Sequence, residues 1–147
     1  MNRDAIKSAL FDLVKVAANF VTVGERLVMW TNVPPEQQPA LYLREGDEDH
    51  PARAAQQMPP RRTLDFEVWI YTKLDIARAN ATDGSLPVPL GTLIGAVEDA
   101  LRPPPVIGRV TLGGLVTHCW IEGLVIKDDG ALTGQALAKI PIRILVP

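Results

Sequence analysis

The side chains that could do chemistry in this sequence fall into two short groups. The first is His118 with Cys119, since a histidine beside a cysteine could serve as a base for a nucleophile. These residues lie in Leu115–Lys127, a strand-like run, and neighbouring residues of a strand point to opposite faces. The two side chains therefore cannot hydrogen-bond as a pair, and we expect Cys119 to be a small buried side chain.

The second group is the run Asp47, Glu48, Asp49 and His50, which could bind a divalent cation. Calcium-binding loops alternate their ligands around a turn glycine over about a dozen residues, and this run does not. Consecutive acids usually form a solvated charge run, so we expect no metal here. Asp128 and Asp129 are likewise better explained as turn residues that hydrogen-bond to their own backbone.

No catalytic or phosphate-binding motif accompanies these groups. The glycines form neither a dinucleotide-binding fingerprint nor a P-loop, and there is no serine elbow, HExxH signature or paired-carboxylate arrangement. The sequence therefore favours a binding or structural role without a cofactor, although an active site assembled from scattered residues would leave no such motif.

Length and composition limit the class of protein further. A chain of 147 residues, of which 47% are hydrophobic, is expected to fold as a single domain over 1–147. Fifteen basic and seventeen acidic residues give a net charge of −2, which argues against a surface that binds duplex DNA. The single cysteine excludes an intramolecular disulfide, and no apolar stretch approaches the ~20 residues of a membrane helix. We expect a soluble protein made in the cytoplasm.

Hydrophobic periodicity predicts the elements that must position these residues. Apolar residues at spacings of three and four predict helices over Arg3–Phe20, with Asn2 or Asp4 as its cap, and over Pro89–Leu101. Strands are predicted over Glu25–Val33, Ala40–Arg44 and Thr63–Lys73. Two loops are predicted, an irregular one at about 46–61 and a second at Ala77–Pro89.

The strand Thr63–Lys73 has two different faces. Leu64, Phe66, Val68 and Ile70 alternate with Asp65, Glu67, Trp69 and Tyr71. The first set is expected to face the core. The second set is acidic at one end and aromatic at the other, which is unusual for a face left wholly in water.

The last third of the sequence predicts a long β-hairpin. Leu115–Lys127 and Gln135–Val146 are strand-like and flank the turn signal Asp128-Asp129-Gly130. Gly123 indicates a bulge, and Pro141 places the second strand at a break in its ladder or, as we favour, at a sheet edge. The whole pattern predicts an α+β fold, with two main helices packed on one face of a mostly antiparallel, curved sheet.

In this order of elements the sequence resembles the tail terminator (minor tail or tail-completion) proteins of long-tailed bacteriophages. The resemblance is carried by ALFDLV in the first helix, QPALYL, EVWIYTK, LIGAVEDALRP, and the closing GGLVTHCWIEGLVIKDDG and ALAKIPIRILV. It covers most of the chain and weakens between Gly46 and Arg61.

The resemblance implies a non-enzymatic virion protein without a cofactor. Such proteins form a hexameric ring on the last ring of the tail tube, at the head-proximal end of the tail. The ring stops tube growth and offers a surface to the head-tail connector protein, with DNA only as passing cargo. Assembly would take place in the host cytoplasm.

A ring subunit needs surfaces that bury against neighbours, and several residues are candidates. The candidates for a subunit or partner interface are Trp69, Tyr71, Arg61, Arg62, Ile142 and Ile144. Asp65 and Glu67 are candidates for a lumen lining that repels the phosphates of passing DNA.

Three other functions stay open at this point. The nearest is another ring protein of the same class: a neck, head-completion or tail-tube protein. A small metal-dependent hydrolase or nuclease would use Asp47, Glu48, Asp49 and His50. A protein-binding adaptor of a cellular operon is the third.

Overall fold

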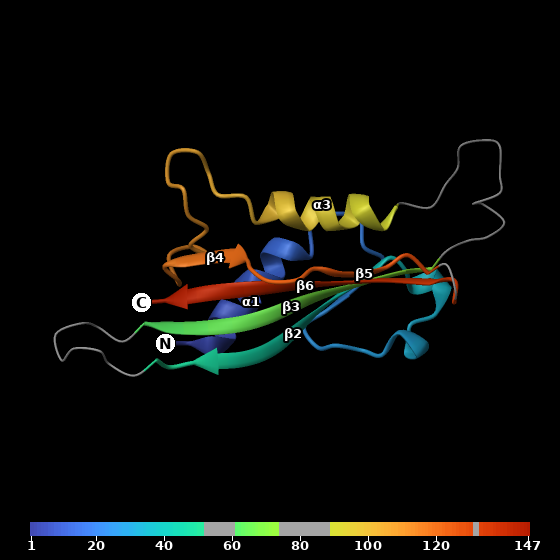
Figure 1. Ribbon diagram of the computed structural model, residues 1–147, viewed down its shortest axis with the longest axis horizontal. Coiled ribbons are helices and arrows are strands. Elements are labelled where there is room, and N and C mark those ends of the chain that lie inside the picture. Colours follow the sequence, from blue (N-terminus) through green and yellow to red (C-terminus); the bar gives the residue numbers. More distant parts are fainter. Residues whose placement is uncertain (52–60, 74–88, 131–132) are drawn as a thin grey trace.

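The fold is organised around an open, mixed β-sheet, shown in Figure 1 for the computed structural model, which describes residues 1–51, 61–73, 89–130 and 133–147. Within these residues the sheet has six strands in the order β1-β2-β3-β6-β4, with β5 also paired to β6. Their bounds are β1 Thr22–Gly24, β2 Ala40–Asp49, β3 Arg62–Lys73, β4 His118–Ile121, β5 Ile126–Asp128 and β6 Gln135–Val146. Among the described strands only β1 and β2 pair in parallel, so the predicted mostly antiparallel sheet is confirmed.

In the described part of the chain, two α-helices cover one face of this sheet (Figure 1). α1 spans Arg3–Val14 and begins where the Asn2 side chain accepts a hydrogen bond from the Ala5 N–H at 3.0 Å. α3 spans Leu90–Ala100, directly after Pro89. The helices bury their apolar stripes in one cluster with the sheet, which confirms the α+β class. No helix among the described residues is long and apolar enough to cross a membrane.

The core lies between these helices and the alternating face of β3 and β6. These two strands pair in register over twelve residues each, from Arg62 opposite Val146 to Lys73 opposite Gln135. Every second side chain of both strands is buried, as the period of two in the sequence predicts. The core residues of the two strands are Leu64, Phe66, Val68, Ile70, Ala138, Ile140, Ile142, Ile144 and Val146.

Two sequence predictions for the first forty residues are wrong. The first helix ends at Val14, not Phe20, although Ala17, Ala18 and Phe20 still pack on the core as irregular chain. The predicted strand Glu25–Val33 is irregular and contains a 3₁₀ helix at Trp30–Asn32. Leu27, Val28 and Val33 pack over the aromatic end of β3 instead of joining the sheet.

β2 is longer than predicted because it continues through a bulge. Glu45 lies opposite Phe66 and Glu48 lies opposite Leu64, so β2 holds one extra residue there. A Cβ at Gly46 would lie 2.9 Å from the Asp65 backbone oxygen, so glycine is the residue that fits. Part of the predicted irregular loop at 46–61 is therefore strand. Residues 52–60 of that loop, and most of Ala77–Pro89, lie outside the described residues.

The C-terminal hairpin forms with a divided first strand. β4 and β5 both pair antiparallel with β6, and the break between them falls at Gly123, which has a positive φ of 116°. The Pro141 carbonyl accepts a hydrogen bond from the Glu122 N–H at 3.2 Å, so the Pro141 backbone faces this break. The missing N–H of Pro141 thus falls where the ladder is interrupted. The edge position favoured for this strand is wrong, because β6 lies between β3 and β4.

Candidate assembly surfaces

The sheet face opposite the helices carries paired charges. The Glu67 carboxylate of β3 lies 3.1 Å from Arg44 of β2 and 3.8 Å from Lys139 of β6. It also accepts a hydrogen bond from the Trp69 indole N–H at 2.9 Å. These partners lie on β3 itself or on β2 and β6, the two strands that pair with β3. The pairing of the strands therefore brings the charged groups together.

Asp65 belongs to a second group of paired charges on the same face. Arg143 of β6 lies 3.0 Å from Asp65 and 3.0 Å from Glu122. Glu122 in turn accepts a hydrogen bond from the Trp120 indole N–H at 2.6 Å. The hydrogen bond to Asp65 is the main reason that the pKa of Arg143 is raised. Both acids suggested as a lumen lining are thus matched by basic partners, which weakens any repulsion of phosphate.

The aromatic end of this face is covered by the protein itself. Tyr71 is 1% exposed, and its hydroxyl donates a hydrogen bond to the Val28 carbonyl at 2.7 Å. It packs against Tyr42 with ring centroids 5.7 Å apart, and burial raises the pKa of Tyr71 to about 12. Residues 27–33 lie over this cluster, so Tyr71 is not available as an interface residue.

Ile142 and Ile144 are also unavailable as interface residues. They are 1% and 0% exposed and belong to the core on the helix side of the sheet. Their placement on an exposed edge followed from the edge assignment of β6, which the strand order contradicts. Trp69 remains partly exposed, as does Arg62, while Arg61 is fully at the surface.

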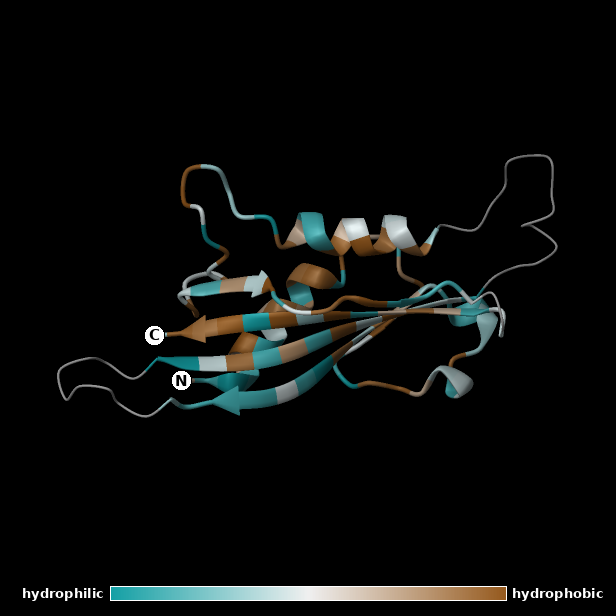
Figure 2. Cartoon of the chain, viewed as in Figure 1, coloured by the Kyte–Doolittle hydropathy of each residue, from teal (hydrophilic) through white to brown (hydrophobic). Residues whose placement is uncertain are grey.

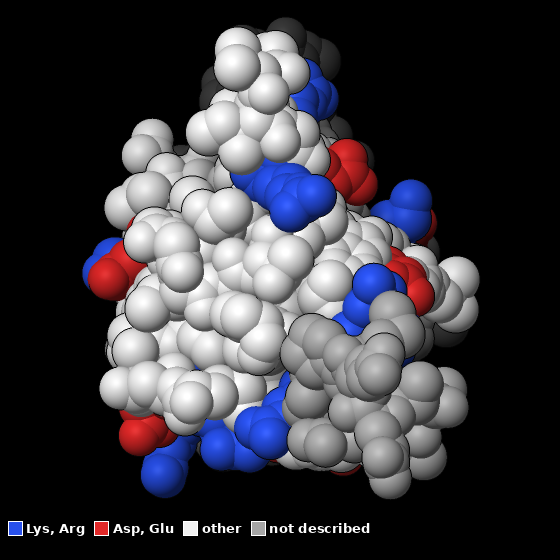
Figure 3. All heavy atoms as spheres, turned by 90° about the vertical axis from the view of Figure 1, so that its left-hand side faces the viewer, with Lys and Arg blue, Asp and Glu red and all other residues white. Residues whose placement is uncertain are grey.

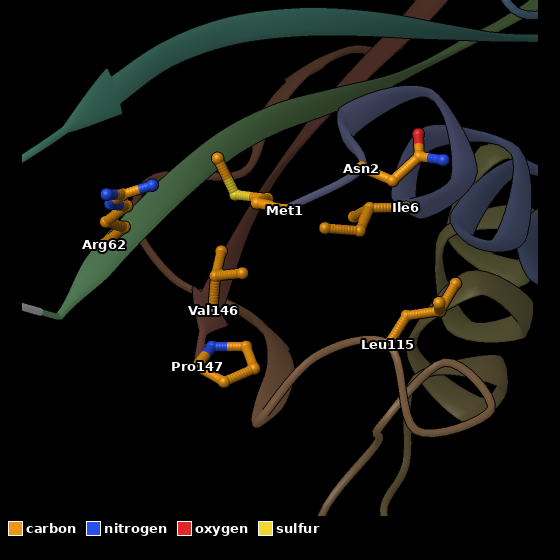
Figure 4. Close-up of a pocket in the computed structure, with 7 residues that line it drawn as sticks. All are labelled: Met1, Asn2, Ile6, Arg62, Leu115, Val146 and Pro147. Atoms are coloured by element: carbon orange, nitrogen blue, oxygen red, sulfur yellow. The ribbon is translucent and has the colours of Figure 1, made fainter. Parts of the chain in front are cut away.

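Arg62 lies at the end of the molecule that carries both chain ends (Figure 1). Figure 3 shows this end with a largely uncharged centre and basic side chains along its lower border. An open pocket of about 270 Å³ lies here, and Figure 4 shows side chains from α1, β3, β6 and the segment before β4 around it. Its lining residues are Met1, Asn2, Ile6, Arg62, Leu115, Val146 and Pro147.

An exposed arm at residues 102–109 is the surface that sequence reasoning missed. The triplet Pro103-Pro104-Pro105 indicated only the end of a helix, although the same segment continues into Val106 and Ile107. These two side chains are 97% and 64% exposed. The available signal in the sequence was the pair of aliphatic residues directly after the proline run. Because prolines disrupt helices and strands, side chains beside them are often left exposed to solvent.

The two candidate chemical groups are engaged in structural contacts. Cys119 is fully buried, whereas the His118 ring accepts a hydrogen bond from the Val110 N–H at 3.2 Å and stacks on Trp120 at 5.0 Å. The prediction that His118 and Cys119 diverge is confirmed. Burial raises the pKa of Cys119 to about 12, so its reactive thiolate is scarce.

Glu48 makes ion pairs from within the acidic run. Glu48 pairs with Arg3 of α1 and lies 3.0 Å from the His50 ring. Glu45 of the same strand lies 3.7 Å from Lys7 of α1, so these acids help attach the helix to β2. Within the described part of the chain, no group of three or more His, Cys, Asp or Glu side chains is placed to hold a metal ion.

A comparison with solved structures finds chains of similar fold, among them a virion protein. The chain aligns with a protein of the virion of a native gene transfer agent particle, with a TM-score of 0.52 and 17% sequence identity. The alignment covers 97% of this chain and 95% of the other. No family model matches the chain, and no curated protein matches it. At this identity the likeness shows a shared fold.

Proposed function

We propose that this chain is a structural protein of a phage-like virion. The observation that carries the proposal is the fold it shares, over nearly the whole of both chains, with a protein of a gene transfer agent virion. Because the alignment leaves only a few per cent of either chain uncovered, the likeness extends beyond one common motif.

Within that class, we propose the role of a tail terminator that forms a hexameric ring at the head-proximal end of a tail tube. The resemblance of the sequence to such proteins supports this role. The ring would end tube polymerisation and provide the surface for head-tail joining, with the tail tube protein and the head-tail connector protein as its partners. Other neck, head-completion and tail-tube ring proteins are the alternative within the same class.

The chemistry of the described surfaces supports a non-enzymatic role. Glu48, one of the four residues that a metal-dependent hydrolase would use, is paired with Arg3 of α1 and with His50. His118 and Cys119 are held in separate environments. These groups act in folding and packing.

Electron microscopy of particles made with and without this chain tests the proposal. Without a terminator, tails should have uncontrolled length or fail to join heads. Normal tails joined to heads in the deletion would refute the terminator role. A chain missing from purified wild-type particles would refute the virion assignment as a whole.

The hydrolase alternative has its own test. The double variant Asp47→Asn/Asp49→Asn should assemble into particles as the wild type does. We also expect metal-dependent hydrolysis of nucleic acid in neither protein. Hydrolysis that is present in the wild type and absent in this variant would support the hydrolase hypothesis.

A further inference from the structure

The arm at residues 102–109 presents an apolar tip in a preformed shape. Proline rings fix φ at Pro103, Pro104 and Pro105, and the Gly108 N–H donates to the Pro104 carbonyl at 2.9 Å. This bond closes a turn that holds Val106 and Ile107 outward. Figure 2 shows the hydrophobic tip standing away from α3 and the sheet. A preformed apolar element loses little conformational freedom when it binds.

The open pocket at the end of the molecule has apolar residues in its lining. Ile6, Leu115 and Val146 contribute apolar walls, while Arg62 supplies a charged side chain (Figure 4). A dry apolar cavity of about 150 Å³ can hold a benzene molecule. The pocket here, at about 270 Å³, therefore has room for two aliphatic side chains.

The arm of the same chain does not fill this pocket. None of the residues 102–109 lines it, although Leu115, at the base of the segment that follows the arm, does. Each chain thus carries an exposed apolar tip and an open apolar pocket that are not joined to each other.

We propose that Val106 and Ile107 of one copy insert into the pocket of a second copy. This inference rests on the proposed ring and supplies the contact between its subunits. A contact between two different surfaces of the same chain is heterologous, and repetition of such a contact closes into a ring when the rotation allows. Val106 and Ile107 are the anchors, and Leu115 is the wall residue that they meet.

Disulfide trapping tests the contact directly. The double variant Val106→Cys/Leu115→Cys places one thiol on the tip and one in the pocket wall, and the native Cys119 is buried with a pKa of about 12. Oxidation of assembled particles should give a ladder of covalent multimers on non-reducing gels. Each single variant should stay monomeric, as should the control Val16→Cys/Leu115→Cys, because Val16 is 72% exposed but follows α1, outside the arm.

The pattern of products decides between arrangements. Covalent dimers without larger products would indicate reciprocal pairing of two copies and would overturn a ring contact. Monomers alone, in particles that contain the double variant at wild-type levels, would also overturn it.

Charge substitutions separate this contact from the proposed function. Val106→Asp and Leu115→Asp, each at an exposed position, should fold normally but lower self-association roughly tenfold or more. An equal mixture of the two variants retains one intact tip and one intact pocket, so it should form dimers and no rings. If the Val106→Asp variant forms rings as well as the wild type does, the proposed contact is wrong, but the terminator role is not affected. If those rings then fail to join tails, the tip binds another virion protein instead.

Discussion

Gly123 packs against Pro141 across the break between β4 and β5. A Cβ at Gly123 would lie 3.3 Å from Pro141 Cγ, and Gly123 itself has a φ of 116°. The pair places the two residues least suited to a continuous ladder directly beside each other in the sheet. On the other side of β6, the pairing with β3 is continuous.

Replacement of Gly123 should destabilise the protein. Gly123→Ala forces an L side chain into a backbone conformation that costs about 1–3 kcal/mol. Chemical denaturation should show this loss in the free energy of unfolding. The matched control is Gly95→Ala in α3, where an added Cβ meets no atom within 4 Å and helix propensity should add up to about 1 kcal/mol. Equal stability of Gly123→Ala and wild type would contradict the account of this break.

Removal of the Tyr71 hydroxyl should loosen residues 27–33. Tyr71→Phe takes away the hydrogen bond to the Val28 carbonyl and should cost about 1 kcal/mol in unfolding free energy. Hydrogen exchange should rise in the covering segment more than in β6. Tyr42→Phe is the control, since the Tyr42 hydroxyl has no hydrogen-bond partner among the described residues. A similar effect of both variants would show that ring packing alone holds the segment.

The ion pair between α1 and β2 should make stability depend on acid pH. The hydrogen bond from Arg3, followed by that from His50, lowers the pKa of Glu48 from 4.5 to about 2. A carboxyl group with a lowered folded-state pKa stabilises the protein above its unfolded pKa, and the contribution is lost as pH falls toward the folded value. Glu48→Gln should therefore be less stable than wild type at neutral pH, and the difference should shrink between about pH 4.5 and 2.

Urea denaturation of both proteins across this range measures the effect. Glu98→Gln, at an exposed position of α3, provides the control for a general change of charge. A stability difference between wild type and Glu48→Gln that stays constant as pH falls would contradict the assigned pair.

Neutralising the acids of the open sheet face should make it bind DNA. Asp65→Asn with Glu67→Gln leaves Arg44, Lys139 and Arg143 without their carboxylate partners on β3. The fold should lose about 1 kcal/mol for each of these partly exposed pairs. Binding to duplex DNA should rise at low salt and fall steeply as salt is added. If instead ring formation fails in a variant that folds, the face belongs to a subunit contact and not to a lumen.

The sequence predicts the regular elements of this fold well because their packing is periodic. The alternation in β3 places Leu64 and Phe66 in the core, and the helical stripe of Pro89–Leu101 places Leu93 and Val97 there. In each case one side of an element meets the core, so burial repeats with the geometry of the backbone.

The errors arise where apolar residues serve a different neighbour. Val33 is buried in one cluster with Tyr71, although its segment is not a strand, so the hydrophobic pattern of that segment does not reflect strand pairing. β1 has three residues, which is too short for any alternation to be recognised. Ile142 and Ile144 were assigned to an edge from Pro141 alone, whereas the strand order depends on contacts with residues far away in the sequence.

The candidate surfaces are predicted less well for the same reason. Asp65 and Glu67 are correctly placed on one face of β3, but their basic partners lie on β2 and β6. The spacing of residues within one strand cannot reveal which charges a neighbouring strand supplies.

The long ladder between β3 and β6 also governs how the chain reaches its fold. About sixty residues separate Lys73 from Gln135 along the chain, and the two strands pair over twelve residues each. The chain loses loop-closure entropy before the stabilising contacts between these two strands form, and this slows folding. During synthesis, β3 keeps an unpaired edge until the last strand has left the ribosome. The nascent chain is thus exposed to strand-to-strand aggregation from the synthesis of β3 until that of β6, and rapid folding must wait for β6.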